Sequence, residues 1–256
     1  RQMNDPAYFY QLNDKIEFDT IFADLLKRRF LDLRKTDAAG LREFCAGTEA
    51  IFCKPAGLCG GEGIQRIVTA DIQDYEKLYR QLVQGGQLLI EEPIRQHPDM
   101  CKLCPDSVNT VRIVTLVTEQ GAQMVYALVR MGMGGVCVDN VSSGGMYAPV
   151  NEQGQLYRPA FCDKTGKYYD RHPVTGTDIV GFQIPLFDQA LALCRTASKR
   201  VEAHLKYIGW DVAITPDGPV LVEGNNLPGY DMCQNAGHVD EGMLPRFEKL
   251  LGRPIM

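Results

Sequence analysis

The chain has 256 residues, of which 45% are hydrophobic and 23% charged, and its formal net charge is -5. This composition is typical of soluble globular proteins, and the length allows one large domain or two smaller lobes. The negative charge, without any block of Lys and Arg, argues against nucleic acid and anionic membrane surfaces as partners.

No apolar run is long enough to span a membrane, and the first residues, "RQMNDPAYFY", carry no signal-peptide pattern. Nine scattered cysteines are typical of free thiols in a reducing compartment, so we expect a cytoplasmic protein. Cys101 and Cys104 form a lone CxxC pair with no second pair or histidines nearby at ligand spacing. Buried packing is the favoured interpretation for this pair, and also for Cys53 and Cys59.

The first third of the chain mixes helices with short strands. Apolar spacing and capping residues predict helices over 17–33, 36–47 and 71–85. Two short strands, 50–54 and 63–70, are joined by a glycine-rich connection.

Strands dominate from Gln87 onward, and the stretch 151–176 is expected to have little regular structure. The predicted strands are 87–94, 111–118, 122–132 and the two halves of a hairpin over 209–226. The predicted helices are 187–208 and 241–251. This order predicts an α+β fold, with two lobes and a ligand cleft between them.

The hairpin "GWDVAITPDGPVLVEGNN" carries acids in an otherwise apolar pattern. A three-residue loop from Pro216 to Gly218 would place Asp211 opposite Glu223, with Asn225 on the same face. Two facing carboxylates repel each other, so we expect a positive charge between them. An oxygen-only set of Asp, Glu and Asn suits Mg²⁺ or Mn²⁺. The alternative is that both acids lie on the solvated face of an ordinary hairpin, and this stretch alone leaves both interpretations open.

A lysine and four glycines follow the first predicted strand pair. Lys54 ends a strand and precedes Gly57, Gly60, Gly61 and Gly63. In a P-loop the lysine follows the glycines, so here we expect a glycine flap whose backbone amides can approach phosphates. A flexible hairpin loop is the alternative.

Three further stretches place polar residues beside predicted strands. "LLIEEPI" leaves the sheet at Pro93, where backbone groups can face a planar base, although an edge strand bent by proline is the simpler interpretation. Arg112 and Arg130 lie in a Val/Ile/Leu-rich hairpin, where a buried arginine requires a carboxylate or phosphate and a surface arginine requires neither. Asn140 precedes a glycine turn that either lines a pocket or only turns the chain.

Six motifs occur in order: "LNDK", "IFCKPAGLCGGEGI", "LLIEEPI", "NTVRIVTL", "VDNVSSGG" and "IGWDVAITPDGPVLVEGNNLPG". Together they resemble the ATP-grasp superfamily, and more narrowly the sugar-transfer-associated ATP-grasp family. The last motif is the most specific, because Asp, Glu twelve residues later and Asn two residues beyond match the family's metal-ligand spacing.

The resemblance implies a role for each matching residue. The implied ligands of two Mg²⁺ ions, with Mn²⁺ as an alternative metal, are Asp211, Glu223 and Asn225. The implied ATP contacts are Lys15, Lys54, the flap glycines Gly57, Gly60, Gly61 and Gly63, and an adenine hinge of Glu91, Glu92 and Ile94. The implied catalytic residues, facing the γ-phosphate, the acyl phosphate and the substrate, are Arg112, Arg130 and Asn140.

The resemblance also implies an ATP-grasp fold whose two α+β lobes grip ATP: a helical lead-in (1–50), a small lobe (51–94) and a large lobe (95–256). The implied activity is that of an ATP-dependent carboxylate–amine ligase, acting on small-molecule substrates in polysaccharide, cell-surface glycan or small-peptide formation. An ATP-grasp kinase and a non-catalytic nucleotide-binding domain are the alternatives. Most family ligases carry an α/β domain before the first lysine, whereas fourteen residues precede Lys15. The substrate site is therefore expected to be built differently or to lack a portion.

Overall fold

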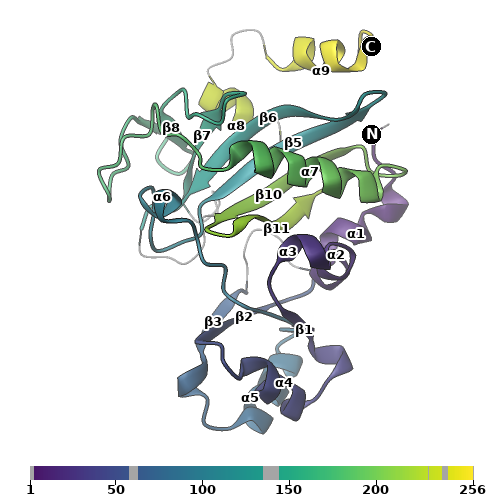
Figure 1. Ribbon diagram of the computed structural model, residues 1–256, viewed down its shortest axis with the longest axis vertical. Helices are drawn as coiled ribbons and strands as arrows, with labels where there is room; N and C mark the ends of the chain where they lie inside the picture. The colour runs from purple at the N-terminus through teal and green to yellow at the C-terminus, as the bar shows by residue number, and fades with distance from the viewer. Residues whose placement is uncertain (1–2, 58–62, 135–143, 230, 238–241, 256) are drawn as a thin grey trace. The chain divides into compact units, whose positions relative to one another are not determined.

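The computed structural model describes residues 3–57, 63–134, 144–229, 231–237 and 242–255 (Figure 1). The chain forms two compact units, each described by itself below. Unit 1 comprises Arg1–Phe9 and Arg95–Met256, and unit 2 comprises Tyr10–Ile94. None of the helices in the described ranges is long and apolar enough to cross a membrane.

Unit 2 is built on a four-stranded antiparallel sheet with the strand order β1-β4-β2-β3. Its elements are α1 (Tyr10–Asn13), α2 (Lys15–Ile21), α3 (Ala23–Leu26), β1 (Phe30–Asp32), η2 (Leu33–Lys35), α4 (Ala38–Cys45), β2 (Ala50–Lys54), β3 (Gln65–Val68), η3 (Thr69–Asp71), α5 (Tyr75–Gln84) and β4 (Leu89–Glu91).

One face of the unit 2 sheet packs against α4 and α5. Leu41 of α4 and Leu82 of α5 are buried with Ile51 and Ile90 in one apolar cluster. Because side chains alternate along a strand, Glu91 points to the other face from Ile90. The sheet therefore has an apolar face and a face that carries a buried acid.

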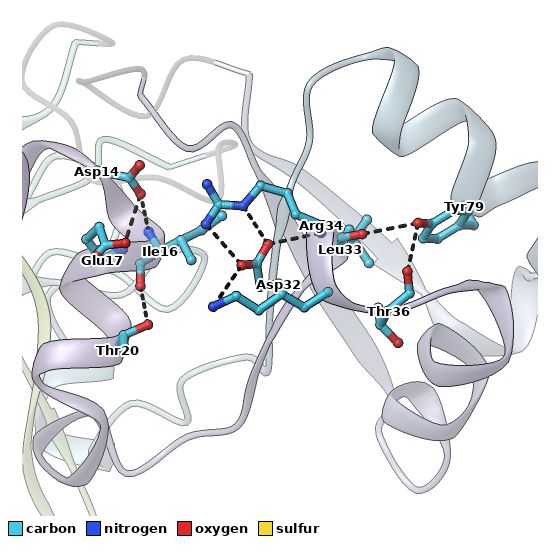
Figure 2. Close-up of polar contacts among 10 residues, drawn as sticks. Asp14, Ile16, Glu17, Thr20, Asp32, Leu33, Arg34, Thr36 and Tyr79 are labelled. Carbon is cyan, nitrogen blue, oxygen red and sulfur yellow. Dashed lines mark hydrogen bonds and ion pairs between the residues drawn. The ribbon is translucent and has the colours of Figure 1, made fainter.

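Polar contacts fix the connection between β1 and α4 (Figure 2). The Tyr79 hydroxyl of α5 lies 3.1 Å from the Leu33 carbonyl oxygen and 2.8 Å from that of Thr36. Asp32 accepts the backbone N–H of Arg34 at 3.0 Å and pairs with its guanidinium, with Nε 2.9 Å from Oδ1. These contacts hold the short strand β1 in place beside the helices.

Unit 1 is built on a seven-stranded antiparallel sheet with the strand order β11-β10-β5-β6-β7-β8-β9. Its elements are η1 (Pro6–Tyr8), α6 (Pro98–Cys101), β5 (Thr110–Thr118), β6 (Gly121–Met131), β7 (Met146–Val150), β8 (Ala160–Cys162), β9 (Lys167–Tyr169), α7 (Phe187–Val201), β10 (Tyr207–Thr215), β11 (Gly218–Asn225), α8 (Asp231–Gly237) and α9 (Leu244–Leu251).

The helix α7 lies across one face of the central strands of this sheet (Figure 1). Trp210 of β10 is fully buried there, and its indole N–H donates to Thr115 Oγ1 at 3.0 Å and to Ser198 Oγ of α7 at 3.1 Å. On the other face, α8 and α9 pack over an apolar cluster that includes Val114 and Cys233. Successive side chains of β10 and of β5 therefore alternate between the face covered by α7 and the face covered by α8 and α9.

The helix expected over 17–33 is wrong in its second half. The helix α3 ends at Leu26, and Lys27 adopts the left-handed conformation with φ of 50°. The chain then enters β1, where Phe30 pairs with Glu91 of β4. Apolar residues that continue a helical spacing are used here by a strand, because pairing with a distant segment overrides local periodicity.

Other predicted boundaries shift for similar reasons. The helix α5 begins after Asp74, whose side chain caps it, and not at Asp71. The helix α7 ends at Val201, and Tyr207 already belongs to β10. The strands β8 and β9 lie in the stretch 151–176, which was expected to be irregular. The helix within 36–47 and both predicted hairpins are confirmed.

The turn of the β10–β11 hairpin has two residues, and the expected three-residue loop is wrong. Thr215 pairs with Gly218, which leaves Pro216 and Asp217 in the turn. Gly218 has φ of 112°, a conformation that glycine adopts without the steric cost of a side chain.

A β-bulge then restores the register that the sequence predicted. Val212 pairs with Leu221, whereas Asp211 pairs with Glu223, so Val222 is the extra residue. The predicted pairing of Asp211 with Glu223 is confirmed, although a bulge and not the loop produces it.

Candidate functional site

Four charged side chains lie on one face of the unit 1 sheet, on four neighbouring strands. The register places Asp211 of β10 opposite both Glu223 of β11 and Arg112 of β5. Arg112 pairs with Leu128 of β6, and Arg130 lies two residues farther along that strand on the same face. Asp211, Glu223, Arg112 and Arg130 are termed the unit 1 charge cluster.

Both guanidiniums of this cluster converge on Asp211. Arg112 donates to Oδ1 through Nε and to Oδ2 through Nη2, the second bond at 2.8 Å, and Arg130 Nη1 donates to Oδ2 at 2.6 Å. Glu223 Oε1 lies 3.9 Å from Arg112 Nη2 and 4.0 Å from Arg130 Nη1. Asp211 is 1% exposed, whereas the Glu223 side chain is 37% exposed. Asp211 therefore does not lie on a solvated face, and the anion that the buried arginines require is this carboxylate.

The charges of the cluster shift the pKa of its members. Burial acts to raise the pKa of Asp211, but the guanidiniums of Arg112 and Arg130 outweigh it and hold that pKa well below the ordinary range. Burial acts to lower the pKa of Arg112, and the Asp211 carboxylate outweighs this effect and raises it. Partial burial and the charge of Asp211 raise the pKa of Glu223. Glu223 is thus the acid whose ionised form gains most from an added cation.

Gly209 lies beside the unit 1 charge cluster, and its lack of a side chain leaves space for the Arg112 side chain. A Cβ at Gly209 would lie 2.9 Å from Pro228 Cβ and 3.1 Å from Arg112 Cδ. Asn225, opposite Gly209, donates its side-chain amide to the Gly209 carbonyl at 3.3 Å. By strand alternation Asn225 shares the face of Glu223, so the three predicted metal ligands lie on one face as expected.

The oxygen atoms on this face fit a divalent cation, with unequal contributions. A carboxylate has about four lone-pair positions, and the contacts with Arg112 and Arg130 already use three of those on Asp211. Glu223 and Asn225 would therefore be the main ligands. In the described part of the chain, no three His, Cys, Asp or Glu side chains group as a metal site.

Unit 2 has its own group of buried charges, on the sheet face opposite its apolar cluster. Glu91 of β4 divides its carboxylate oxygens between two cations. Arg28 donates to Oε1 through Nε at 2.7 Å and also through Nη2, and the Lys54 ammonium contacts Oε2. Asp19 Oδ1, from α2, lies 3.8 Å from Arg28 Nη2. Asp19, Arg28, Lys54 and Glu91 are termed the unit 2 charge cluster.

The pKa values of the two acids of this cluster are shifted in opposite directions. Both are 2% exposed, and Oδ2 of Asp19 is buried without a hydrogen-bond partner among the described residues. Burial, and then the charge of Glu91, raise the pKa of Asp19 well above its ordinary value. Burial acts in the same direction on Glu91, but Arg28 and Lys54 outweigh it and lower its pKa. Of the two buried acids, Glu91 is therefore the one that ionises more readily.

Lys15 begins α2 in unit 2. Asp14 caps this helix by accepting the backbone N–H groups of Ile16 and Glu17 (Figure 2). The Lys15 backbone N–H donates to the carbonyl of Ala56 at 2.9 Å, and Ala56 is only two residues beyond Lys54. This backbone hydrogen bond therefore holds the segment of Lys15 beside the segment that follows Lys54.

The predicted flap is described only at its two ends. Gly57 is exposed, and a Cβ there would meet nothing within 4 Å. Gly63 has φ of +72°, which favours glycine, and its carbonyl accepts the Gln87 side-chain amide at 2.7 Å. Gly60, Gly61 and the predicted substrate-side Asn140 lie outside the described residues.

Glu92 pairs with a different arginine from its neighbour Glu91. Its carboxylate accepts Arg29 Nε at 2.7 Å and the Arg29 backbone N–H at 2.9 Å. Its own backbone N–H donates to the Arg29 carbonyl at 3.1 Å. A base bound at the predicted hinge would therefore use other backbone groups, such as those of the half-buried Ile94.

Sequence analysis does not identify Arg28 or Asp19 as site residues. Asp19 lies within an apolar helical stripe between Phe18 and Phe22, and a buried acid in such a stripe needs a cationic partner. The doublets 28–29 and 91–92 also hold a signal, because two adjacent cations and two adjacent acids can form two separate ion pairs, as Arg28 with Glu91 and Arg29 with Glu92 do.

Comparisons with known proteins place these features in a family. Over residues 1–250 the sequence matches the family described as sugar-transfer associated ATP-grasp. A search of curated proteins finds no match.

Solved ATP-grasp ligases share the fold at low sequence identity. PsnB, in complex with a phosphomimetic variant of its minimal precursor, Mg and ADP, has a TM-score of 0.54 and 16% identity over 97% of this chain and 60% of its own. D-alanyl-alanine synthetase A from Vibrio cholerae O1 has a TM-score of 0.51 and 13% identity, over 98% of this chain and 64% of its own. D-cycloserine synthetase DcsG has a TM-score of 0.56 and 15% identity, over 96% and 70%.

The chain spans less than two thirds of PsnB and of the D-alanyl-alanine synthetase. The mixed α+β architecture with two sheets matches these ligases over nearly the whole of the present chain. With the sequence match over residues 1–250, this shows that the chain belongs to the sugar-transfer-associated ATP-grasp family.

Proposed function

We propose that this protein is an ATP- and Mg²⁺-dependent ligase that activates a carboxylate as an acyl phosphate and joins it to an amine. The family and the fold support an ATP-dependent enzyme of the ligase type. PsnB is named as an ATP-grasp ligase and the other two neighbours as synthetases, which also supports ATP-driven bond formation. The acid and the amine are assigned by chemical class only.

The unit 1 charge cluster is the observation that carries the proposal. Asp211 is fixed between two buried guanidiniums, and the partly exposed Glu223 lies beside them. Such a surface offers oxygen ligands to a cation and N–H donors to the phosphate oxygens that accompany it. Charge neutralisation and positioning are what phosphoryl transfer chiefly requires.

In this proposal Glu223 and Asn225 would be the main protein ligands of the metal, and Asp211 would add at most one ligand oxygen. Bound Mg²⁺, with two ions expected, supplies positive charge to the phosphates and so lowers the barrier to transfer. Arg112 uses Nε and Nη2 on Asp211. Because a guanidinium has five N–H donors, Arg112 can keep Asp211 in place and also donate to a phosphate oxygen.

We propose an ATP-binding role for residues of unit 2 as well. Lys15 and Lys54 would contact the phosphates of ATP together with the backbone amides of the glycines in 57–63. The hinge residues 91–94 would bind adenine through backbone groups. Arg130 would share with Arg112 the stabilisation of the transferring group, and Asn140 would contact the substrate.

The proposed reaction has two steps. A substrate carboxylate oxygen attacks the γ-phosphorus while the bond to the β-phosphate oxygen breaks, which gives an acyl phosphate and ADP. The amine nitrogen then attacks the acyl carbon, phosphate leaves with the electrons of the C–O bond, and the nitrogen releases its proton to solvent. Residues of the chain hold and neutralise charge in both steps, and no covalent enzyme intermediate is required.

We propose further that one substrate belongs to a cell-surface glycan precursor or a short peptide. The family name supports the first source, and the precursor peptide of PsnB supports the second. A panel of amino sugars, uronic acids, amino acids and dipeptides, scored by ADP release, separates the two sources.

The experiment that tests the ligase proposal is a trap for the acyl phosphate. The intact chain is incubated with ATP, Mg²⁺, carboxylic acids and hydroxylamine, and ADP and hydroxamate are measured. A ligase gives hydroxamate and ADP in equal amounts, and only when an acid is present. A kinase gives a phosphorylated product that resists hydroxylamine, and a binding domain gives bound nucleotide without ADP. Either of these outcomes would reject the ligase.

A further inference from the structure

Lys54 is paired with a buried carboxylate of its own unit. Its ammonium contacts Glu91 Oε2, and its side chain is only 15% exposed. The register brings the two residues together, because Lys54 pairs with Leu89 of β4 and Glu91 lies two residues farther on the same face. A lysine that must contact phosphate therefore starts from an ion pair and not from water.

We infer that Glu91 is a positioning residue that holds Lys54 while no phosphate is bound, and that a polyphosphate anion replaces Glu91 as the partner of Lys54 on binding. The inference rests on the proposed function in one respect, which is that the natural polyphosphate is that of ATP.

The two partners of Glu91 differ in how easily they can leave. Arg28 donates two N–H groups to Oε1, whereas Lys54 contacts Oε2 with a compact charge on a flexible stem. If Lys54 turns to a phosphate, Arg28 still neutralises Glu91. The exchange therefore leaves no unpaired carboxylate in the interior, which would otherwise oppose it strongly.

Asp19 makes the exchange easier. Its carboxyl group lies 3.8 Å from Arg28, and its Oδ2 is buried with no hydrogen-bond partner in the described part of the chain. At 3.8 Å Asp19 lies farther from Arg28 than Glu91 does, whose Oε1 accepts Arg28 Nε at 2.7 Å, so Asp19 is the weaker competitor for Arg28. Arg28 can then serve Glu91 alone when Lys54 departs.

The neighbouring ion pair provides a matched control. Arg29 and Glu92 each lie one residue beyond Arg28 and Glu91, and they pair with each other without contacting Lys54. A conservative change at Arg29 perturbs the second pair as the same change at Arg28 perturbs the first. It leaves the partner of Lys54 in place.

The test measures Lys54 directly in the full-length chain. Wild type, Glu91→Gln and Glu76→Gln, which changes an exposed acid in the first turn of α5, are treated with a limiting amine-acylating reagent, and acylation of Lys54 is followed by mass spectrometry. Binding of inorganic tripolyphosphate is measured by calorimetry. Lys54 should be acylated about fivefold faster in Glu91→Gln, and tripolyphosphate should bind about fivefold tighter, because neither the reagent nor the anion then competes with a carboxylate for the amine. Glu76→Gln should match wild type, and tripolyphosphate should protect Lys54 in wild type.

A second pair of variants covers the case in which Glu91→Gln fails to fold. Arg28→Lys keeps the charge but removes the two-pronged hold on Oε1, so Glu91 should be less fixed and Lys54 acylation should rise by about twofold. Arg29→Lys is its control and should behave as wild type.

The inference is overturned if Lys54 acylation is the same in wild type, Glu91→Gln and Arg28→Lys, or if Glu91→Gln binds tripolyphosphate more weakly than wild type. Its failure can be told apart from failure of the proposed function. If ADP and hydroxamate form but Lys54 acylation does not change in Glu91→Gln, the inference alone is wrong. If tripolyphosphate binding depends on Glu91 but no ADP ever forms, the ligase alone is wrong.

Discussion

In unit 1 a buried carboxylate, Asp211, is held by two arginines, whereas in unit 2 the buried Glu91 is held by one arginine and one lysine. The unit 1 residues come from four neighbouring strands whose register fixes their positions. The unit 2 residues come from β2, β4, the helix α2 and the segment before β1.

This difference in partners predicts a difference in behaviour. Guanidiniums grip a carboxylate with several directed N–H bonds, and an ammonium acts as a single mobile charge. The unit 1 charge cluster should therefore be a fixed part of the fold, and the unit 2 charge cluster should exchange one partner. The predictions that follow separate fixed from exchangeable charges, beginning with the largest effect.

Asp211→Asn should have the largest effect on stability. It leaves two buried guanidiniums without their carboxylate, and the free energy of unfolding of unit 1 should fall by about 3–5 kcal/mol. Urea denaturation measures this change. Asp217→Asn, in the exposed turn of the same hairpin, is the control and should change the value by less than about 0.5 kcal/mol. A loss no larger than in the control would show that Asp211 does not hold the arginines in solution.

Gly209→Ala should have the next largest effect. The added methyl group would press on Pro228 and Arg112, so the free energy of unfolding should fall by about 1–3 kcal/mol. Gly57→Ala in unit 2, where a Cβ meets nothing within 4 Å, should leave thermal stability nearly unchanged. Equal melting temperatures for the two variants would contradict the close packing beside Arg112.

Glu223→Gln should leave the stability of the fold nearly unchanged but lower the affinity for the metal ion. Its side chain is 37% exposed and lies 3.9–4.0 Å from the guanidiniums, so stability should change by less than about 1 kcal/mol. The affinity for Mn²⁺ in the presence of nucleotide should fall by about tenfold or more, as measured by electron paramagnetic resonance. Glu119→Gln, in an exposed turn, is the control. An unchanged Mn²⁺ affinity would remove Glu223 from the metal site.

The smallest expected effect is an opposite response of the two units to pH. In unit 1, burial lowers the pKa of His172 below its ordinary 6.5, and its Nδ1 accepts backbone N–H groups of Val174 and Thr175. The stability that His172 contributes is therefore present above pH 6.5 and is lost as the pH falls through the lowered value. In unit 2, the pKa of Asp19 is raised above 3.8, so its contribution is present below that pH and is lost as the pH rises through the raised value.

Hydrogen exchange measured by peptide, and corrected for the intrinsic effect of pH, reports the two units separately. From pH 5.5 to 8.5, protection should rise in unit 1 of the Glu223→Gln variant, in which the raised pKa of Glu223 no longer opposes the trend of His172, and should fall in unit 2. His172→Gln should flatten the first trend and Asp19→Asn the second. Trends of the same sign in both units would show that other groups control the pH response.

Much of the unit 1 site could be predicted because its pattern is local. Eleven residues lie between Asp211 and Glu223, so a single hairpin brings them close, and the turn together with the bulge sets the exact pairing. The alternation of one strand also placed Asn225 correctly. The identity of the positive partner could not be predicted, because Arg112 and Arg130 reach Asp211 only through the pairing of β10 with β5, which no local spacing reveals.

The unit 2 site was harder to predict, because its residues come from helix, strand and connection. Arg28 was assigned to a long helix, whereas the structure ends that helix at Leu26 and turns the chain into a strand. A residue assigned to that helix gives no reason to expect a contact with β4, so the pairing of Arg28 with Glu91 could not be predicted. The roles of Gly60, Gly61 and Asn140 remain predictions from the resemblance.

The bulge at Asp211 and Val212 has a consequence for how this hairpin can change in length. A two-residue turn with one bulged residue and a three-residue loop with none both keep eleven residues between the acids and set them face to face. The two arrangements are interchangeable solutions of one constraint. Moving the surplus residue from Val222 into the turn should therefore preserve the site, whereas adding or removing a residue at only one of these places would change the spacing by which the family is recognised.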